Sequence, residues 1–128
     1  MTIRVQDISV LETASMYSEH LSQPFFDDIQ SGKKKFEGRL VKKIWASLKE
    51  GDIIRWYNSD KGSEETFFSI VVSLQKFKTF AEAIESVGLE NILPSEIGNS
   101  IEDAVKNVYR IWYNAEDEKK YGVVLVGF

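Results

Sequence analysis

The stretch from residue 32 to residue 40 reads GKKKFEGRL, and it says most about the fold. Apolar and charged side chains alternate from residue 34 to residue 41, which predicts a strand with one buried face. Phe36 falls on the apolar side of this strand, whereas Glu37 and Arg39 share the other side. The stretch therefore predicts a half-buried strand that carries a charged pair.

Lys34, Glu37 and Arg39 have two interpretations. As a site, the arginine fork suits a phosphate or a base edge, lysine adds a point charge, and the glutamate orients both or accepts from an exocyclic amine. As structure, the glutamate and the arginine are two apart on one strand face and would form a salt bridge. Lys34 falls on the side of Phe36 if the strand begins that early, where it either snorkels or has its pKa lowered by desolvation.

The cations of the chain are unevenly distributed. Residues 33–43 hold six cations and one anion, so this window carries a net charge of +5 and the rest of the chain carries −9. A basic island on an acidic body predicts a local anion site, and the alternative is a solvated lysine-rich turn. The six cations are Lys33, Lys34, Lys35, Arg39, Lys42 and Lys43.

The composition limits the class of protein. The 128 residues have room for one domain, which we expect at residues 16–128, after a leader of uncertain order at residues 1–15. The absence of cysteine excludes disulfides, thiolate metal sites and a cysteine nucleophile, and the single histidine, His20, disfavours a multi-histidine metal site. No apolar run is long enough to span a membrane, so we expect a cytoplasmic protein with no membrane partner, metal or cofactor.

The remaining pattern predicts further strands and helices. Strands are expected at residues 17–21, 53–57, 66–77 and 121–128. Helices are expected in three places, between Pro24 and Gly32, from a capping box at Thr79 to Gly88, and after Ser100. Because the strands cluster in mid-chain with helices between them, we expect an α+β fold built on a small curved sheet or barrel. The sequence has no glycine-rich phosphate loop, which disfavours a doubly wound nucleotide-binding fold.

Three further expectations concern side chains on these elements. The apolar stripe from Ile101 to Trp112 recurs at helical spacing, which predicts that Trp112 lies in the core. Trp45 lies just after the basic island and is the aromatic residue that we expect to stack on a base. The charged run at residues 116–120 indicates a solvated connection.

The GKKKFEGRL stretch resembles the GxKxxEGR signature of the ASCH domain, a small β-barrel relative of the PUA domain. Residues 48–54, LKEGDII, are similar to the turn and strand that come next in that family. Residues 77–80, 88–94 and 118–124 are similar, in the same order, to stand-alone ASCH proteins of bacteria and archaea. The resemblance spans residues 17–128 and implies an α+β fold of the PUA-like type, a small β-barrel with flanking helices.

This resemblance implies an RNA- or nucleotide-binding domain whose cleft lies beside the GxKxxEGR strand. The partner would be single-stranded RNA or a nucleoside or nucleotide ligand, because the acidic body would repel a long duplex. The residues expected to bind it are Lys33, Lys34, Lys35, Glu37, Arg39 and Trp45.

Two alternatives remain open. Some small bacterial members are amidohydrolases that deacetylate N4-acetylcytidine with a lysine, a threonine and a glutamate, and a ribonuclease activity has been proposed for other relatives. The lysine falls on Lys34, Glu37 stands in the place of the threonine, and the glutamate falls near Glu85 or Glu90. Lys34 and Glu37 would then be the catalytic residues. The other alternative is an interaction domain whose basic island meets an acidic protein.

Overall fold

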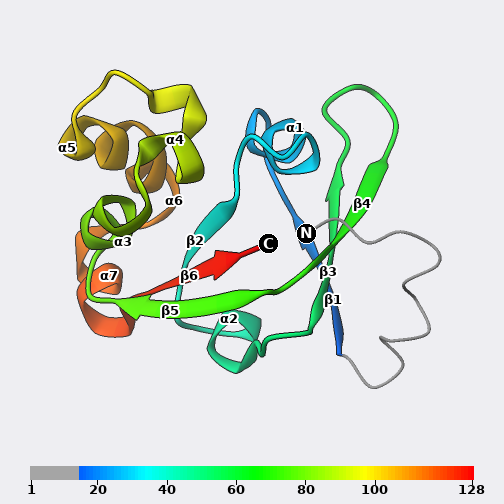
Figure 1. The fold of residues 1–128 in the computed structure, drawn as a ribbon, viewed down its shortest axis with the longest axis horizontal. Coiled ribbons are helices and arrows are strands. Elements are labelled where there is room, and N and C mark those ends of the chain that lie inside the picture. Colours follow the sequence, from blue (N-terminus) through cyan, green and yellow to red (C-terminus); the bar gives the residue numbers. More distant parts are fainter. Residues whose placement is uncertain (1–14) are drawn as a thin grey trace.

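The computed structural model describes residues 15–128, and the predicted leader, except for Ser15, lies outside the described residues. The fold is α+β, with most of the helices grouped at one end of two small sheets (Figure 1). The first sheet holds β1 (Met16–His20), β3 (Ile53–Asn58) and β4 (Glu65–Ile70). The second holds β2 (Phe36–Leu40), β6 (Val123–Gly127) and β5 (Ser73–Phe77).

Each sheet has its most buried strand in the middle. In the first sheet β3 pairs in parallel with β1 and antiparallel with β4. In the second sheet β6 lies between β2 and β5 and pairs antiparallel with both. All five residues of β6 are buried, which agrees with its uninterrupted apolar sequence VVLVG.

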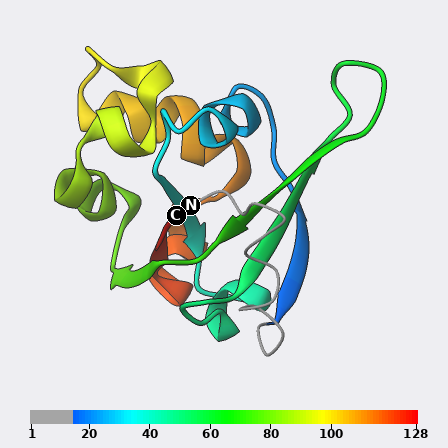
Figure 2. The same cartoon turned by 45° about the vertical axis from the view of Figure 1, so that its right-hand side comes forward.

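The strand predicted at residues 66–77 is divided between the two sheets. Only Val71 and Val72 separate β4 from β5, and the chain curves from one sheet into the other at this point (Figure 2). The N–H of Val71 donates to the carbonyl of Asp52 at 2.9 Å, and the N–H of Val72 donates to the carbonyl of Gly127 at 2.8 Å. The predicted curved sheet therefore consists of two three-stranded sheets that are linked at this point.

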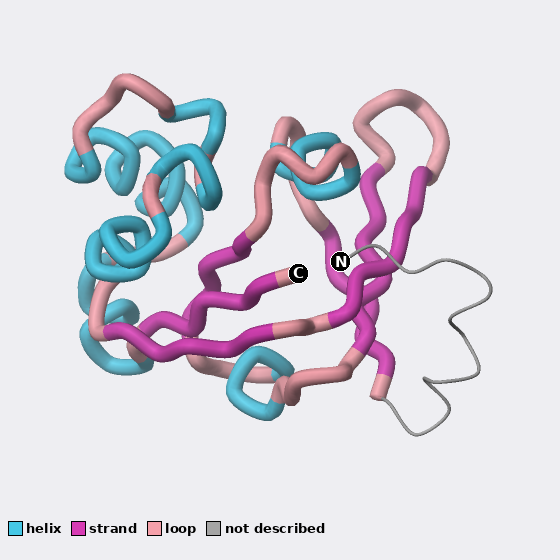
Figure 3. The backbone as a smooth tube through the Cα atoms, in the orientation of Figure 1, coloured by secondary structure: helices cyan, strands magenta, loops and turns pink. Residues whose placement is uncertain are grey.

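The helices frame the second sheet and the space between the sheets (Figure 3). The N-terminal capping residues predicted for two of them are confirmed, because Thr79 Oγ1 accepts from the N–H of Glu82 and Ser100 Oγ accepts from the N–H of Asp103, both at 3.1 Å. The helical elements up to residue 96 are α1 (Phe25–Gln30), α2 (Ile44–Ser47), α3 (Phe80–Val87), α4 (Leu89–Ile92) and the short 3₁₀ turn η2 (Pro94–Glu96).

The helix that follows contains a π turn, which corrects the predicted core face. It begins as α5 (Ile101–Ala104), continues as the π-helical η3 (Val105–Tyr109) and ends as α6 (Arg110–Trp112). A π turn inserts one residue relative to an α-helix, so the side chains beyond it are rotated about the helix axis. The buried stripe therefore passes to Tyr109, and the prediction that Trp112 lies in the core is wrong, because its exposed fraction is 50%.

The charged run at residues 116–120 is also not the solvated connection that we predicted. It lies in helix α7 (Ala115–Tyr121), and Glu118 is buried. One oxygen of the Glu118 carboxylate accepts from the N–H of Phe80, and the other pairs with Arg110 Nη2, both at 2.7 Å. This carboxylate therefore joins three helical segments, because it satisfies a free N–H at the start of α3 and neutralises a cation on α6.

Replacing Glu118 by alanine should lower the free energy of unfolding by about 1–3 kcal/mol, because the Phe80 N–H and the Arg110 guanidinium both lose their partner. Urea denaturation measures this loss. Glu116, exposed on the same helix, gives the matched control Glu116→Ala, which should change stability by less than about 1 kcal/mol. Equal losses in the two variants would contradict the role assigned to Glu118.

Candidate functional site

A cavity of about 400 Å³ opens where β1, the loop after it, β2 and the helix with the π turn meet. Its volume lies in the range typical of small-molecule sites. Its lining includes a charged pair on β2, Glu37 and Arg39, together with His20 at the end of β1. Its aromatic residues are Phe25, Tyr109, Trp112 and Tyr113.

Lys34, Glu37 and Arg39 form a buried ionic network at this cavity. Glu37 Oε1 lies 3.3 Å from Lys34 Nζ, and Glu37 Oε2 accepts a hydrogen bond from Arg39 Nε at 3.0 Å. The Lys34 ammonium also donates to the carbonyl of Ile92. Lys34 lies in the loop before β2 and does not line the cavity, so it contacts Glu37 from the side away from the cavity. The salt bridge expected between Glu37 and Arg39 is present, with Glu37 buried and the Arg39 side chain 17% exposed.

The pKa values in this network follow from burial and from the mutual charges. Burial lowers the pKa of the Lys34 ammonium, and the nearby Glu37 only partly offsets this effect. Burial alone would raise the pKa of Glu37, but the charges of Lys34 and Arg39 outweigh it and hold this pKa below its usual value. Burial alone would lower the pKa of Arg39, and Glu37 outweighs it in the same way and raises that pKa. Glu37 is therefore ionised between two cations.

Trp45 is placed differently from the expectation of a base-stacking residue. Its exposed fraction is 7%, its ring packs on that of Trp56 at a centroid distance of 6.2 Å, and it does not line the cavity. The guanidinium of Arg39 lies 4.7 Å from the centroid of the Trp45 ring. Trp45 thus supports Arg39 from the side away from the cavity, through a cation–π contact.

The other predicted binding residues, Lys33 and Lys35, are exposed and lie outside the cavity lining. The backbone of this loop is fixed, because the N–H of Lys34 donates to the carbonyl of Asp28 at 2.9 Å and the N–H of Lys35 donates to the carbonyl of Asn91 at 2.8 Å. The loop therefore buries the middle lysine and presents the two outer lysines to solvent.

Sequence reasoning assigned Trp112 to the core and did not identify Phe25 and Tyr109 as residues of the cavity. Tyr109 ends the π turn, Trp112 ends α6 and Tyr113 follows it, and all three line the cavity. Trp112 makes an edge-to-face contact with Phe25 at a centroid distance of 6.1 Å. The signal in the sequence is the density of aromatic residues at the end of the predicted helix, but helical spacing assigned one of these residues, Trp112, to the core.

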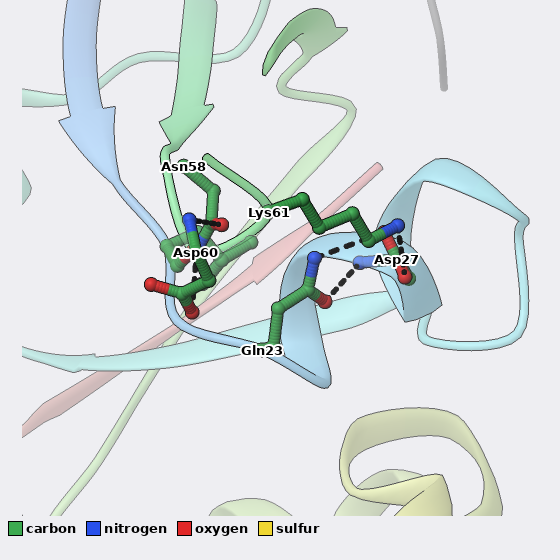
Figure 4. A network of polar contacts seen from close by, with 6 residues as sticks. Gln23, Asp27, Asn58, Asp60 and Lys61 are labelled. Carbon is green, nitrogen blue, oxygen red and sulfur yellow. Dashed lines mark hydrogen bonds and ion pairs between the residues drawn. The ribbon is translucent and has the colours of Figure 1, made fainter. Parts of the chain in front are cut away.

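The loop between β1 and α1 borders the cavity and is held in place by the β3–β4 hairpin (Figure 4). Asn58 Nδ2 donates to the carbonyl of Leu21 at 2.8 Å, and Asn58 Oδ1 accepts from the N–H of Asp60 at 2.8 Å. Lys61 Nζ reaches Asp27 Oδ2 on α1 at 3.3 Å. These contacts fix the backbone that places His20 and Phe25 at the cavity.

Other expectations concern catalysis, metals and membranes. Glu85 and Glu90, the two candidates for a third catalytic residue, are exposed, and neither lines the cavity. Among residues 15–128, no group of three or more histidine, aspartate or glutamate residues is arranged to hold a metal ion. No helix in this part of the chain combines the length and apolar character needed to cross a membrane.

Comparisons with known proteins agree with this architecture. The crystal structure of hypothetical protein PH0355 has a TM-score of 0.73 and 37% sequence identity, and the match covers 88% of this chain and 95% of that one. The solution structure of protein PF0455 from Pyrococcus furiosus has a TM-score of 0.68 and 36% identity, covering 88% of this chain and 94% of that one. The comparison with curated proteins gave no match. The family model of the ASCH domain matches residues 20–128, and the chain therefore belongs to the ASCH domain family, whose fold is PUA-like.

Proposed function

We propose that this protein binds RNA or a nucleotide ligand by taking one unpaired nucleotide into the cavity between β2 and the π-turn helix. The observation that carries the proposal is the combination of a fixed ionic pair, Glu37 and Arg39, with several aromatic rings around one cavity. Aromatic rings stack on the face of a base, and the ionic pair supplies donors and an acceptor for its edge. Membership of the ASCH family supports the same class of ligand.

The charge distribution supports a single unpaired strand or a small ligand. Lys33 and Lys35 are exposed beside β2 and are available to phosphate groups, whereas the chain outside residues 33–43 carries a net charge of −9. Phosphate contacts of this kind weaken as salt rises, and contacts inside the cavity change much less. The basic GxKxxEGR strand would thus attract the backbone, while the cavity would hold the base.

Trp112→Ala should weaken the binding of a short single-stranded RNA about 10-fold or more, because base–aromatic stacking contributes about 1–3 kcal/mol per base. Trp112 lines the cavity and is 50% exposed, so its loss should leave the fold intact. Fluorescence anisotropy of a labelled RNA, repeated at several salt concentrations, measures the dissociation constant.

Ile111→Ala is the matched control for this measurement, because Ile111 is the neighbouring exposed residue and does not line the cavity. It should bind RNA as the unaltered protein does. If Trp112→Ala and Ile111→Ala bind equally well, the cavity is not the site of the base. Absence of binding by the unaltered protein at low salt would contradict the proposed function itself.

An amidohydrolase acting on N4-acetylcytidine-type nucleosides at the same cavity is the second candidate. The buried ammonium of Lys34 and its lowered pKa favour it, because such a lysine is a recognised catalytic group. Against it, Lys34 does not line the cavity, and both oxygens of Glu37 already pair with cations. Mass spectrometry of free N4-acetylcytidine incubated with the protein tests this candidate, because release of cytidine that is lost in Lys34→Ala would establish it.

A further inference from the structure

Tyr109 carries a buried hydroxyl that the fold itself does not use. Its exposed fraction is 3%, and its ring stacks on Phe80 at a centroid distance of 4.0 Å and an interplanar angle of 10°. The residue nevertheless lines the cavity, and within residues 15–128 its hydroxyl has no hydrogen-bond partner. A phenylalanine would make the same stack without burying an unpaired polar atom. A buried unpaired hydroxyl at a cavity wall indicates a ligand that supplies its partner.

The backbone of β2 leaves room for this hydroxyl. Gly38 lies between Glu37 and Arg39 and also lines the cavity. A Cβ at this position would lie 3.1 Å from the Tyr109 hydroxyl oxygen and 3.5 Å from the Phe80 ring, the first of which is closer than most Cβ contacts. The glycine of the GxKxxEGR strand therefore leaves beside the hydroxyl the space that a side chain would take.

The protonation states of the neighbouring groups define what the cavity offers. Burial, helped by the negative charge of Glu37, raises the pKa of Tyr109 well above its usual value, so the phenol is neutral and its O–H can donate. The ionised carboxylate of Glu37 can only accept, and each of its oxygens has a lone pair beyond those used by Lys34 and Arg39. The lining of one cavity thus includes a donor, Tyr109, and an acceptor, Glu37.

We infer that Tyr109 is a specificity-determining residue, whose hydroxyl donates to an acceptor atom on the pairing edge of a nucleobase while Glu37 accepts from the adjacent N–H. The inference rests on the proposed function and adds to it that the cavity reads a base edge as well as a base face. A base edge that places an N–H beside a carbonyl oxygen or a ring nitrogen has this complementary pattern. A phosphodiester group does not, because its oxygens can only accept.

The experiment compares Tyr109→Phe with the unaltered protein in two measurements. The probes are short single-stranded homo-oligonucleotides of each base and, for the one bound most tightly, its counterpart methylated on the ring nitrogen of the pairing edge. In unaltered protein, methylation should weaken binding about 10-fold to 100-fold, as expected when a site built for hydrogen bonds loses its partner. Tyr109→Phe should show a similar loss with the unmethylated probe and little further loss with the methylated one.

Thermal unfolding separates recognition from structure. Because the hydroxyl has no partner in the free protein, Tyr109→Phe should have an unchanged or higher Tm. Tyr17→Phe, on β1 and outside the cavity lining, is the matched control and should alter neither Tm nor binding. Gly38→Ala gives a second test, because its methyl group should disturb the hydroxyl. As a single substitution it should weaken binding, and combined with Tyr109→Phe it should add little to the loss.

The outcomes are distinguishable. If the unaltered protein binds none of the oligonucleotides, the proposed function fails and this inference fails with it. If the unaltered protein binds but Tyr109→Phe binds equally well, only the inference is overturned. A lower Tm in Tyr109→Phe with an unchanged response to base methylation would assign the hydroxyl a structural role and would also overturn it.

Discussion

Replacing Glu37 by glutamine is expected to lower the free energy of unfolding at pH 7 by about 3–5 kcal/mol, the cost typical of breaking a buried ion pair by removing one partner. The reason is the number of positive charges that the substitution leaves without an anionic partner. Glu37 is 7% exposed and is the anion between Lys34 at 3.3 Å and Arg39 at 3.0 Å, so its neutralisation leaves two cations near each other with little access to water. Urea denaturation of both proteins at pH 7 measures the difference.

The pH dependence of this difference has a definite sign. The cations hold the pKa of Glu37 below its usual value, so Glu37 contributes stability above its ordinary pKa of about 4.3, and this stability is lost as pH falls through the folded-state pKa. The free energy of unfolding of the unaltered protein should therefore approach that of the glutamine variant as the solution is made acidic. At alkaline pH the variant should regain stability. Burial already lowers the pKa of Lys34, so in the absence of the glutamate this lysine can lose its proton.

Glu64→Gln is the matched control for Glu37→Gln. Glu64 pairs with Arg55 at the surface, where its side chain is 53% exposed, and such pairs contribute about 0–1 kcal/mol. Similar losses in the two variants would contradict the picture of a buried ionic network. So would a loss in Glu37→Gln that does not change with pH.

The strand that carries this network could be predicted from the sequence, and its surroundings could not. The period-two pattern from residue 34 to residue 41 correctly places Glu37 and Arg39 on one face of β2. On that face the Arg39 guanidinium lies against the rings of Trp45 on α2 and Trp56 on β3, and these contacts come from other elements of the chain. Local alternation reports which side chains share a face, but it carries no information on what packs against that face.

The observed positions of Trp45 and Trp112 have specific physical causes. The predicted apolar stripe from Ile101 to Trp112 assumes 3.6 residues per turn. Because η3 is a π turn, the side chains that follow it are rotated about the helix axis relative to this prediction. Side-chain contacts at Tyr109, such as its stack on Phe80, accompany this irregularity, and no residue type signals it. Trp45 follows the basic island, which is the reason for expecting it to stack on a base, but its ring contacts Arg39 and does not line the cavity.

Helix α7 is not predicted from the sequence, although the sequence contains residues typical of both its N-terminal and its C-terminal cap. Asn114 Oδ1 accepts from the N–H of Asp117 at 2.8 Å, and Gly122 ends the helix with a φ of 74°, which favours glycine. The high charge of residues 116–120 outweighed these signals in the prediction. A buried Glu118 is invisible in such a run, because its burial depends on partners from α3 and α6.

Replacing Lys34 by methionine is expected to lower the free energy of unfolding by about 2–4 kcal/mol, less than Glu37→Gln. Methionine has a similar volume and leaves no large cavity, so the loss comes from the bond to the Ile92 carbonyl and from the contact with Glu37. Glu37 keeps its bond to Arg39, so the variant retains a neutral pair instead of two uncompensated charges. Because burial lowers the pKa of Lys34, the unaltered protein gains stability as pH rises toward about 10.4, and the methionine variant lacks this gain.

The double variant Lys34→Met with Glu37→Gln separates the pair from its surroundings. Its loss should fall short of the sum of the single losses by about 1–3 kcal/mol, because removing the second partner relieves the charge left by removal of the first. Additive losses would contradict a direct coupling between the two residues. The cycle also bears on function, because Lys34 supports the cavity from behind without lining it. A folded Lys34→Met protein should therefore still bind RNA if the site is a binding site, whereas a hydrolase that uses Lys34 as a catalytic residue would lose its turnover altogether.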